Sequence, residues 1–364
     1  MAESRRSLTV NMRVFAYFLG LMKLTSTALL LALLPFAASG HHSMVEYSGS
    51  ESLELNGVVS EVQWGNPHIR FKLLVRNDAG NETLWRLEGI PRSELERNGI
   101  PSNAIAAGDV VTVAGRVSSR REQTMYVRNA LLADRTELLF GSAREPRWPQ
   151  ATRTVGGATD PIDEAKALES EATASGIFRV WRRAIGGNVG RWSGDLPLTD
   201  YAVARRSTFD VIRDNPFANC TPSGMPDAIM RNGWPIEFVD GDDEISLRME
   251  AFGRSRTIHL SADNLPEARP ATPLGHSIGH WEEGTLVVRT TEIDYPYFET
   301  RGGTPQSPSI ELTERFSLSD NDTQLHYEIT VTDPETFTRP VTGSKTWVWT
   351  PGLELAPYEC VPDE

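Results

Sequence analysis

The chain has 364 residues, of which 39 % are hydrophobic and 23 % charged, and its 36 Lys and Arg against 49 Asp and Glu give a net charge of −13. This composition is typical of a soluble globular protein and excludes a disordered tail and a multi-span membrane protein. The acidic excess argues against a nucleic-acid partner, which requires clustered Lys and Arg. Two Cys are too few for a disulfide scaffold or a Cys-based zinc site.

Residues 1–40 predict a signal peptide. Basic residues between Arg5 and Lys23 precede an apolar run at 27–36, and the small residues Ala37-Ala38-Ser39-Gly40 follow it. This order of charge, apolar core and small residues is that of a secretory signal. An uncleaved membrane anchor is the alternative, because 14–22 is also apolar, but the small residues favour cleavage. We therefore expect a periplasmic or secreted protein with no stable membrane anchor after cleavage.

Processing changes the composition and the redox environment. Removing residues 1–40, which carry a net charge of +3, leaves about 324 residues at −16. An exported chain folds in an oxidising compartment, where Cys220 and Cys360 can form a disulfide. The alternative is a pair of buried thiols.

Residues 41–140 predict a small β-barrel. Ile69, Phe71, Leu73 and Val75 alternate with polar residues, as in a half-buried strand, and Gly57 marks a change of phase typical of a bulge. A short helix at 91–98 separates three strands from two more, at 110–117 and 124–133. Three strands, a helix and two strands is the order of an OB-type barrel.

Residues 141–199 predict a linker. Pro and Gly punctuate this range, and the polar stretch 163–175 indicates one helix. A second helix, at 198–213, is expected to pack under the domain that follows.

Residues 200–364 predict an antiparallel β-barrel or curved sheet of about eight strands, similar to a lipocalin. Such a barrel could enclose a small apolar or amphipathic ligand, or could be filled by its own side chains. The expected strands are 235–239, 243–251, 255–260, 276–282, 285–292, 308–318, 323–332 and 340–350.

Two short elements resemble an uncharacterised family of exported bacterial domains. They are His41-His42-Ser43 and Trp64-Gly-Asn-Pro-His68, and the resemblance covers roughly residues 41–140. The second domain resembles other uncharacterised exported β proteins in Cys220-Thr-Pro-Ser-Gly-Met-Pro226, Gly279-His-Trp-Glu282, Glu314-Arg-Phe316, Thr332-Asp-Pro334 and Tyr358-Glu-Cys360. These resemblances imply export and fold, and no reaction.

The predicted new N-terminus is a candidate copper site. Cleavage after Gly40 makes His41 the first residue, whose amine and imidazole could bind one Cu(II) together with His42 or His68. Cleavage after Ser39 gives Gly40-His41-His42, in which a His at position three allows a square-planar Cu(II) site. The alternative is that all three are ordinary surface or turn residues.

Two further sets of residues suggest chemistry in the second domain. Gly275-His-Ser277-Ile-Gly279 fits the G-x-S-x-G elbow of a serine hydrolase, but lacks the strand before it and the helix after it. His280, Trp281 and Glu282 are candidate ligand-binding residues at a barrel rim. The sequence therefore favours a non-enzymatic exported binding or accessory protein with a possible copper site. The alternative is an enzyme, either a copper-dependent oxidoreductase at His41 or a hydrolase at Ser277.

Overall fold

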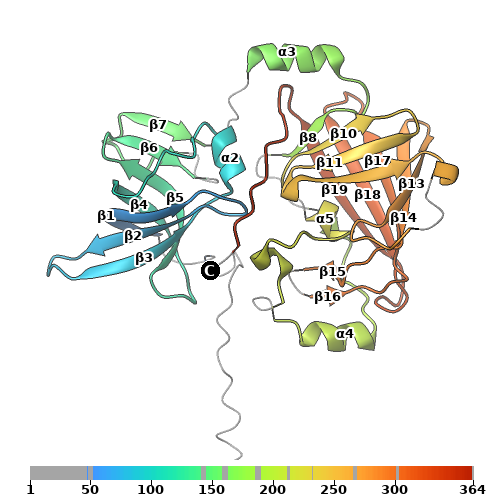
Figure 1. Cartoon of the computed structure of the whole chain (residues 1–364), viewed down its shortest axis with the longest axis horizontal. Helices are drawn as coiled ribbons and strands as arrows, with labels where there is room; N and C mark the ends of the chain where they lie inside the picture. The colour runs from blue at the N-terminus through green and yellow to red at the C-terminus, as the bar shows by residue number, and fades with distance from the viewer. Residues whose placement is uncertain are drawn as a thin grey trace, which may run out of the picture. The chain divides into compact units, whose positions relative to one another are not determined.

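The computed structural model shows a mainly β protein, which confirms the predicted fold class (Figure 1). The predicted signal peptide and the candidate ligands His41 and His42 lie outside the described residues. In the part of the chain that is described, no helix is long and apolar enough to cross a membrane. The described residues are 47, 52–140, 145–157, 163–184, 190–210, 214–231, 233–264, 269–300 and 303–362.

The first sheet closes into a barrel in the strand order β3-β2-β1-β4-β5, because β3 also pairs with β5 in parallel. A short helix, α2 (Arg92–Arg97), lies between β3 and β4 in the chain. This is the predicted OB-type order, with β6 and β7 extending the sheet beyond β5. The strands are β1 (Ser52–Gln63), β2 (Arg70–Arg76), β3 (Glu82–Glu88), β4 (Val110–Val117), β5 (Thr124–Leu132), β6 (Thr136–Leu139) and β7 (Arg153–Gly156).

The change of phase in β1 lies three residues later than the sequence suggested. Leu55, Gly57 and Val59 all face the core, and the register with β2 shifts between Val59 and Glu61, so the bulge is at Ser60. Gly57 has a different role, because a Cβ at this position would lie 2.4 Å from the Leu74 carbonyl oxygen. Glycine therefore allows β1 and β2 to approach closely where the sheet curls.

Residues 141–199, predicted as a linker, also contribute strands to the second barrel. The expected helix is α3 (Glu164–Thr173), which begins at an Asp163 cap and buries no residue. β8 (Val180–Arg183) and β9 (Arg191–Trp192) follow it, and β8 pairs with both β10 and β19. Trp181 in β8 is fully buried. A four-residue strand with flanking arginines is too short for its alternation to stand out in the sequence.

The second barrel is a closed ring of nine strands in the order β18-β17-β14-β13-β12-β11-β10-β8-β19, with β9 beside β19 (Figure 1). Neighbours are antiparallel except β12 and β13, which pair in parallel. The other strands are β10 (Ile236–Asp240), β11 (Glu244–Met249), β12 (Arg254–His259), β13 (His276–Glu282), β14 (Thr285–Thr291), β17 (Glu311–Leu318), β18 (Gln324–Thr332) and β19 (Val341–Trp349). A separate hairpin joins β15 (Tyr297–Glu299) to β16 (Thr304–Pro305).

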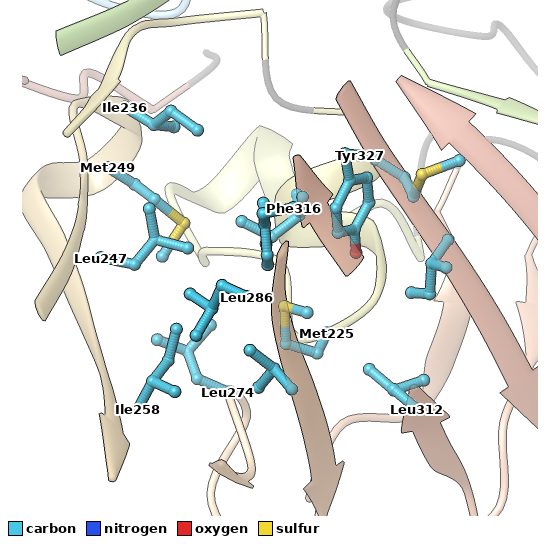
Figure 2. Packing of buried hydrophobic residues seen from close by; sticks show 14 of the residues in the cluster. Met225, Ile236, Leu247, Met249, Ile258, Leu274, Leu286, Leu312, Phe316 and Tyr327 are labelled. Carbon is cyan, nitrogen blue, oxygen red and sulfur yellow. The ribbon is translucent and has the colours of Figure 1, made fainter. Parts of the chain in front are cut away.

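Large side chains from facing strands pack inside this barrel. Figure 2 shows Leu247 and Ile258 on one side of the core, Tyr327 on the other, and Phe316 and Leu286 between them. The rings of Phe316 and Tyr327 lie 4.8 Å apart. Burial of such side chains, each contributing about 1.5–3 kcal/mol, is the main force that closes the ring.

Two helices border the second barrel. The helix expected at 198–213 is α4 (Asp200–Ser207), which begins at Thr199, whose hydroxyl accepts a hydrogen bond from the Ala202 amide. The short α5 (Asp227–Met230) places Ile229 and Met230 in the barrel core.

Cys220 and Cys360 form the expected disulfide. Cys360 lies in the C-terminal segment, whose backbone also pairs with the first barrel: the Asn66 amide donates to the Glu359 carbonyl at 2.9 Å, and the Val361 amide donates to the Asn66 carbonyl at 2.9 Å. The disulfide therefore holds in place the segment that contacts the Trp64–His68 element.

Loss of this disulfide is expected to lower the free energy of unfolding strongly. The bond closes a loop between residues 140 positions apart, for which chain entropy alone gives about 5 kcal/mol. Guanidinium denaturation of the Cys220→Ser/Cys360→Ser protein should show a loss of roughly 2–5 kcal/mol. Reductant should destabilise the native protein similarly and leave the variant unchanged, and an equal effect of reductant on both would contradict the assignment.

Candidate functional site

His68 follows the Trp-Gly-Asn-Pro turn of the first barrel and has an oriented imidazole. Its Nδ1 lies 2.9 Å from the Gly89 carbonyl oxygen, which can only accept, so Nδ1 carries the proton in this bond. Its Nε2 points to the Glu88 carboxylate at 3.6 Å. The His68 side chain is 25 % exposed, so the imidazole is partly accessible to solvent.

Glu88 connects His68 to the described residue nearest the predicted new N-terminus. The Tyr47 hydroxyl donates to Glu88 at 3.1 Å, and the Arg121 guanidinium donates to the Tyr47 hydroxyl at 2.7 Å. The Tyr47 ring also contacts Tyr126, with centroids 5.5 Å apart. We call Tyr47, His68, Glu88 and Arg121 the His68 cluster. Because the four residues of this cluster come from segments far apart in the chain, only His68 was identified as a candidate from the sequence.

The described residues contain no group of three His, Cys, Asp or Glu side chains placed to hold a metal ion. The His68 cluster contributes two such residues, and His41 and His42 are outside the described part of the chain. The predicted copper site is therefore neither assembled nor tested by these residues.

The structure places His280 and Glu282 on one side of β13 and Trp281 on the other. On β13, Ser277 and Gly279 face the core, so Trp281 shares their side of the strand, whereas His280 and Glu282 share the outer side. His280 Nε2 lies 2.9 Å from the Glu282 carboxylate, which also accepts from Arg315 at 3.1 Å. These two hydrogen bonds hold the pKa of Glu282 below its usual range. His280 and Glu282 thus form a solvated ion-pair group.

Ser277 lies within β13 and not at a strand-to-helix turn. It is fully buried, and its Oγ accepts a hydrogen bond from Arg256 Nε at 2.9 Å. Because the Thr290 hydroxyl donates to Glu314, the Ser277 hydroxyl donates to Thr290, 3.1 Å away. A nucleophilic serine requires a general base such as His at this position. The hydrogen bonds of Ser277 are those of a structural residue.

A buried ion pair that the sequence did not reveal crosses the barrel interior. Arg256 on β12 and Glu314 on β17 are 1 % and 0 % exposed, and form a two-point hydrogen-bonded pair. The carboxylate also accepts from Thr290 at 3.0 Å and from Tyr327 at 2.9 Å. Burial and this carboxylate both raise the pKa of Tyr327. Every polar group of the pair is thus provided with a partner, as a charge pair in a dry core requires.

Position 256 carried a weak signal of this arrangement. Arg256 lies two residues before Ile258 and therefore on the same, inward face of β12. Because arginines are rarely buried, the sequence alone favours a solvent-exposed side chain at this position.

Asp227, at the start of α5, is a second buried acid. Its Oδ2 accepts from the Ser223 and Thr300 hydroxyls, each at 2.9 Å, while Arg231 lies 3.5 Å from Oδ1. Burial raises the pKa of Asp227 to about 6, against the opposing effect of Arg231, and Glu299 adds to the rise.

Comparison with known proteins identifies a domain and no activity. Residues 29–125 match a family described as a family of unknown function (DUF6152). The match includes the whole His68 cluster and confirms the predicted resemblance to an uncharacterised family. No curated protein matches the chain.

Removing one member of the buried pair is expected to be far more costly than removing both. Glu314→Leu leaves Arg256 buried without a counter-charge and should lower the free energy of unfolding by about 3–5 kcal/mol. The double variant Arg256→Met/Glu314→Leu should be more stable than this single variant. Urea denaturation of both proteins measures the difference, and a double variant no more stable than Glu314→Leu would contradict the pairing.

The raised pKa of Asp227 predicts a pH-dependent loss of stability. Below about pH 4 the Asp227 carboxyl is largely protonated in both the folded and the unfolded protein. Between about pH 4 and 6 it is ionised in the unfolded chain but still largely protonated in the folded protein. Ionisation of the unfolded chain lowers the free energy of unfolding as pH rises, by up to about 3 kcal/mol above pH 6.

Asp227→Asn keeps an acceptor for Ser223 and Thr300 but cannot ionise. Its free energy of unfolding, relative to the native protein, should therefore increase by about 2–3 kcal/mol between pH 4 and pH 7.5. Parallel pH profiles for the two proteins would contradict the raised pKa.

Proposed function

We propose that the chain is an exported binding or accessory protein that holds one copper-type ion at the end of its first barrel. The ligands would be the amine and imidazole of His41, freed by signal cleavage, and the imidazole of His68. The observation that carries the proposal is the orientation of His68.

His68 has the arrangement of a metal-binding histidine. Such residues usually donate one ring N–H to a carbonyl or carboxylate, which fixes the tautomer and makes the other nitrogen the ligand. The bond from Nδ1 to Gly89 provides this, and directs Nε2 to the barrel edge beside Glu88. The Glu88 carboxylate lies 3.6 Å from both His68 Nε2 and the Arg121 guanidinium.

The chain length also supports the proposal. Tyr47 is anchored to Glu88, and His41 is only six positions before it. Six residues can span up to about 20 Å, so the new N-terminus can reach His68.

The disulfide supports export. Disulfides form and persist mainly outside the reducing cytoplasm, and Cys220 and Cys360 account for both cysteines of the chain. A periplasmic or secreted location agrees with the basic and apolar pattern of residues 1–40.

Titration of the processed protein with Cu(II) tests the proposal. N-terminal sequencing first establishes whether the chain begins at His41 or at Gly40. For a start at His41, calorimetry should show one site with a dissociation constant below 1 µM, on the order of −8 kcal/mol. His41→Ala and His68→Ala should each weaken binding at least tenfold.

Two controls make the result specific. His326→Ala removes a histidine from β18 in the other barrel and should leave the affinity unchanged. A start at Gly40 would place His42 at position three and make binding independent of His68. That outcome, or binding weaker than micromolar, would overturn the proposed site.

A further inference from the structure

A cavity of about 350 Å³ lies in the wall of the second barrel, at the parallel join between β12 and β13. The join consists of only two residue pairs, Ile258 with Ser277 and His259 with Ile278. The first four residues of β12, 254–257, and the segment 272–276 therefore border the cavity instead of pairing with each other.

The segment before β13, residues 272–274, forms backbone hydrogen bonds with parts of the chain other than β12. Thr272 forms a parallel bridge with Ile293, and its carbonyl accepts from the Asp294 amide at 2.8 Å. The Pro273 carbonyl accepts from the Met225 amide at 2.9 Å. These bonds draw residues 272–274 away from β12, so the opening is built into the fold.

The lining is rich in basic side chains although the whole protein is acidic. It contains two arginines, two histidines and four residues with hydroxyl side chains, and no Asp or Glu. Arg256 is neutralised by Glu314, and the two histidines lie within 4.0 Å of Glu244 and Glu292 respectively.

Arg254 is different from the other cations of the cavity. None of the ion pairs among the described residues includes it, and its guanidinium donates to a backbone carbonyl, that of Ser223. Burial lowers the pKa of Arg254, which shows that its charge is partly removed from water. Among the described residues, no carboxylate forms an ion pair with Arg254 that would offset its desolvation.

One side of the cavity is apolar. Pro273 and the buried Leu274 contribute to the lining, and Figure 2 shows Leu274 in the core near Ile258. A ligand that fits both surfaces has an anionic end for Arg254 and a short apolar part.

We propose that this cavity binds a small organic carboxylate, with the carboxylate at Arg254 and the apolar part against Pro273 and Leu274. The planar guanidinium fork matches the geometry of a carboxylate, and a volume of this size is ordinary for a small-molecule site. Thr257 adds a hydroxyl to the lining, whereas the Ser255 hydroxyl pairs with that of Ser246 and the Thr272 hydroxyl donates to the Gly275 carbonyl. The site is separate from the proposed copper site and does not depend on it.

The motif Gly275-His-Ser277 has a structural role at this cavity. All three residues line the cavity. Gly275 has φ +69°, and a Cβ there would lie 2.7 Å from the Thr291 carbonyl oxygen, so glycine permits the turn that enters β13. The motif therefore shapes one wall of the cavity.

Binding of benzoate and hexanoate to the purified protein, measured by calorimetry and by the rise in melting temperature, tests the proposal. Both should bind and stabilise, while benzamide, which has the same shape as benzoate without its charge, should not. Inorganic phosphate should bind at least tenfold more weakly than benzoate. Binding of phosphate alone, or equal binding of benzoate and benzamide, would overturn the proposal.

Variants locate the site. Arg254→Gln should weaken benzoate binding at least tenfold, whereas Arg248→Gln, which removes an exposed arginine from the neighbouring β11, should not change it. If Arg254→Gln does not fold, Thr257→Phe provides the test. Thr257 is exposed and lines the cavity, so the larger side chain should block the cavity and weaken benzoate binding while Arg254 is retained. Unchanged benzoate affinity in Thr257→Phe would contradict the assignment.

Discussion

The parallel join between β12 and β13 determines much of the second barrel. Every other join in the ring of nine strands is antiparallel, and this one consists of two residue pairs. A ring that closes with so short a join needs additional support. Arg256 supplies it, because its side chain leaves β12, bonds Ser277 on β13 and pairs with Glu314 on β17. The same short join leaves the cavity beside Arg254.

Charge is distributed differently in the two barrels. In the first, the Glu88 carboxylate lies beside the oriented His68 imidazole, accepts from the Tyr47 hydroxyl and is 3.6 Å from the Arg121 guanidinium, and we propose a cation at this imidazole. In the second, Arg254 has a backbone carbonyl as its partner, an arrangement suited to an anion. The two proposed sites thus differ in ligand charge and can be tested separately.

Alternation of polar and apolar residues predicted most strands, because each barrel strand has one face in a dry core and one in water. The strand expected at 276–282 is β13 residue for residue. The same reasoning failed for β8, which is too short to show a period. It also misplaced the bulge of β1, because Gly57 is needed where β1 and β2 approach closely and not at the bulge itself. It also could not find Arg256 and Glu314, since an inward charge is recognisable only when its partner on a distant strand is known. His68 was found as a residue type, but its orientation depends on the Gly89 carbonyl, 21 positions away.

A crystal structure of the processed protein with one equivalent of copper, measured at the copper absorption edge, tests the central claim most directly. The account predicts a single anomalous peak at about 2.0 Å from His68 Nε2, the usual length of a metal–imidazole bond, with the amine and imidazole of His41 completing the site. Absence of a peak at His68, with copper instead at other histidines or at the N-terminus alone, would contradict it.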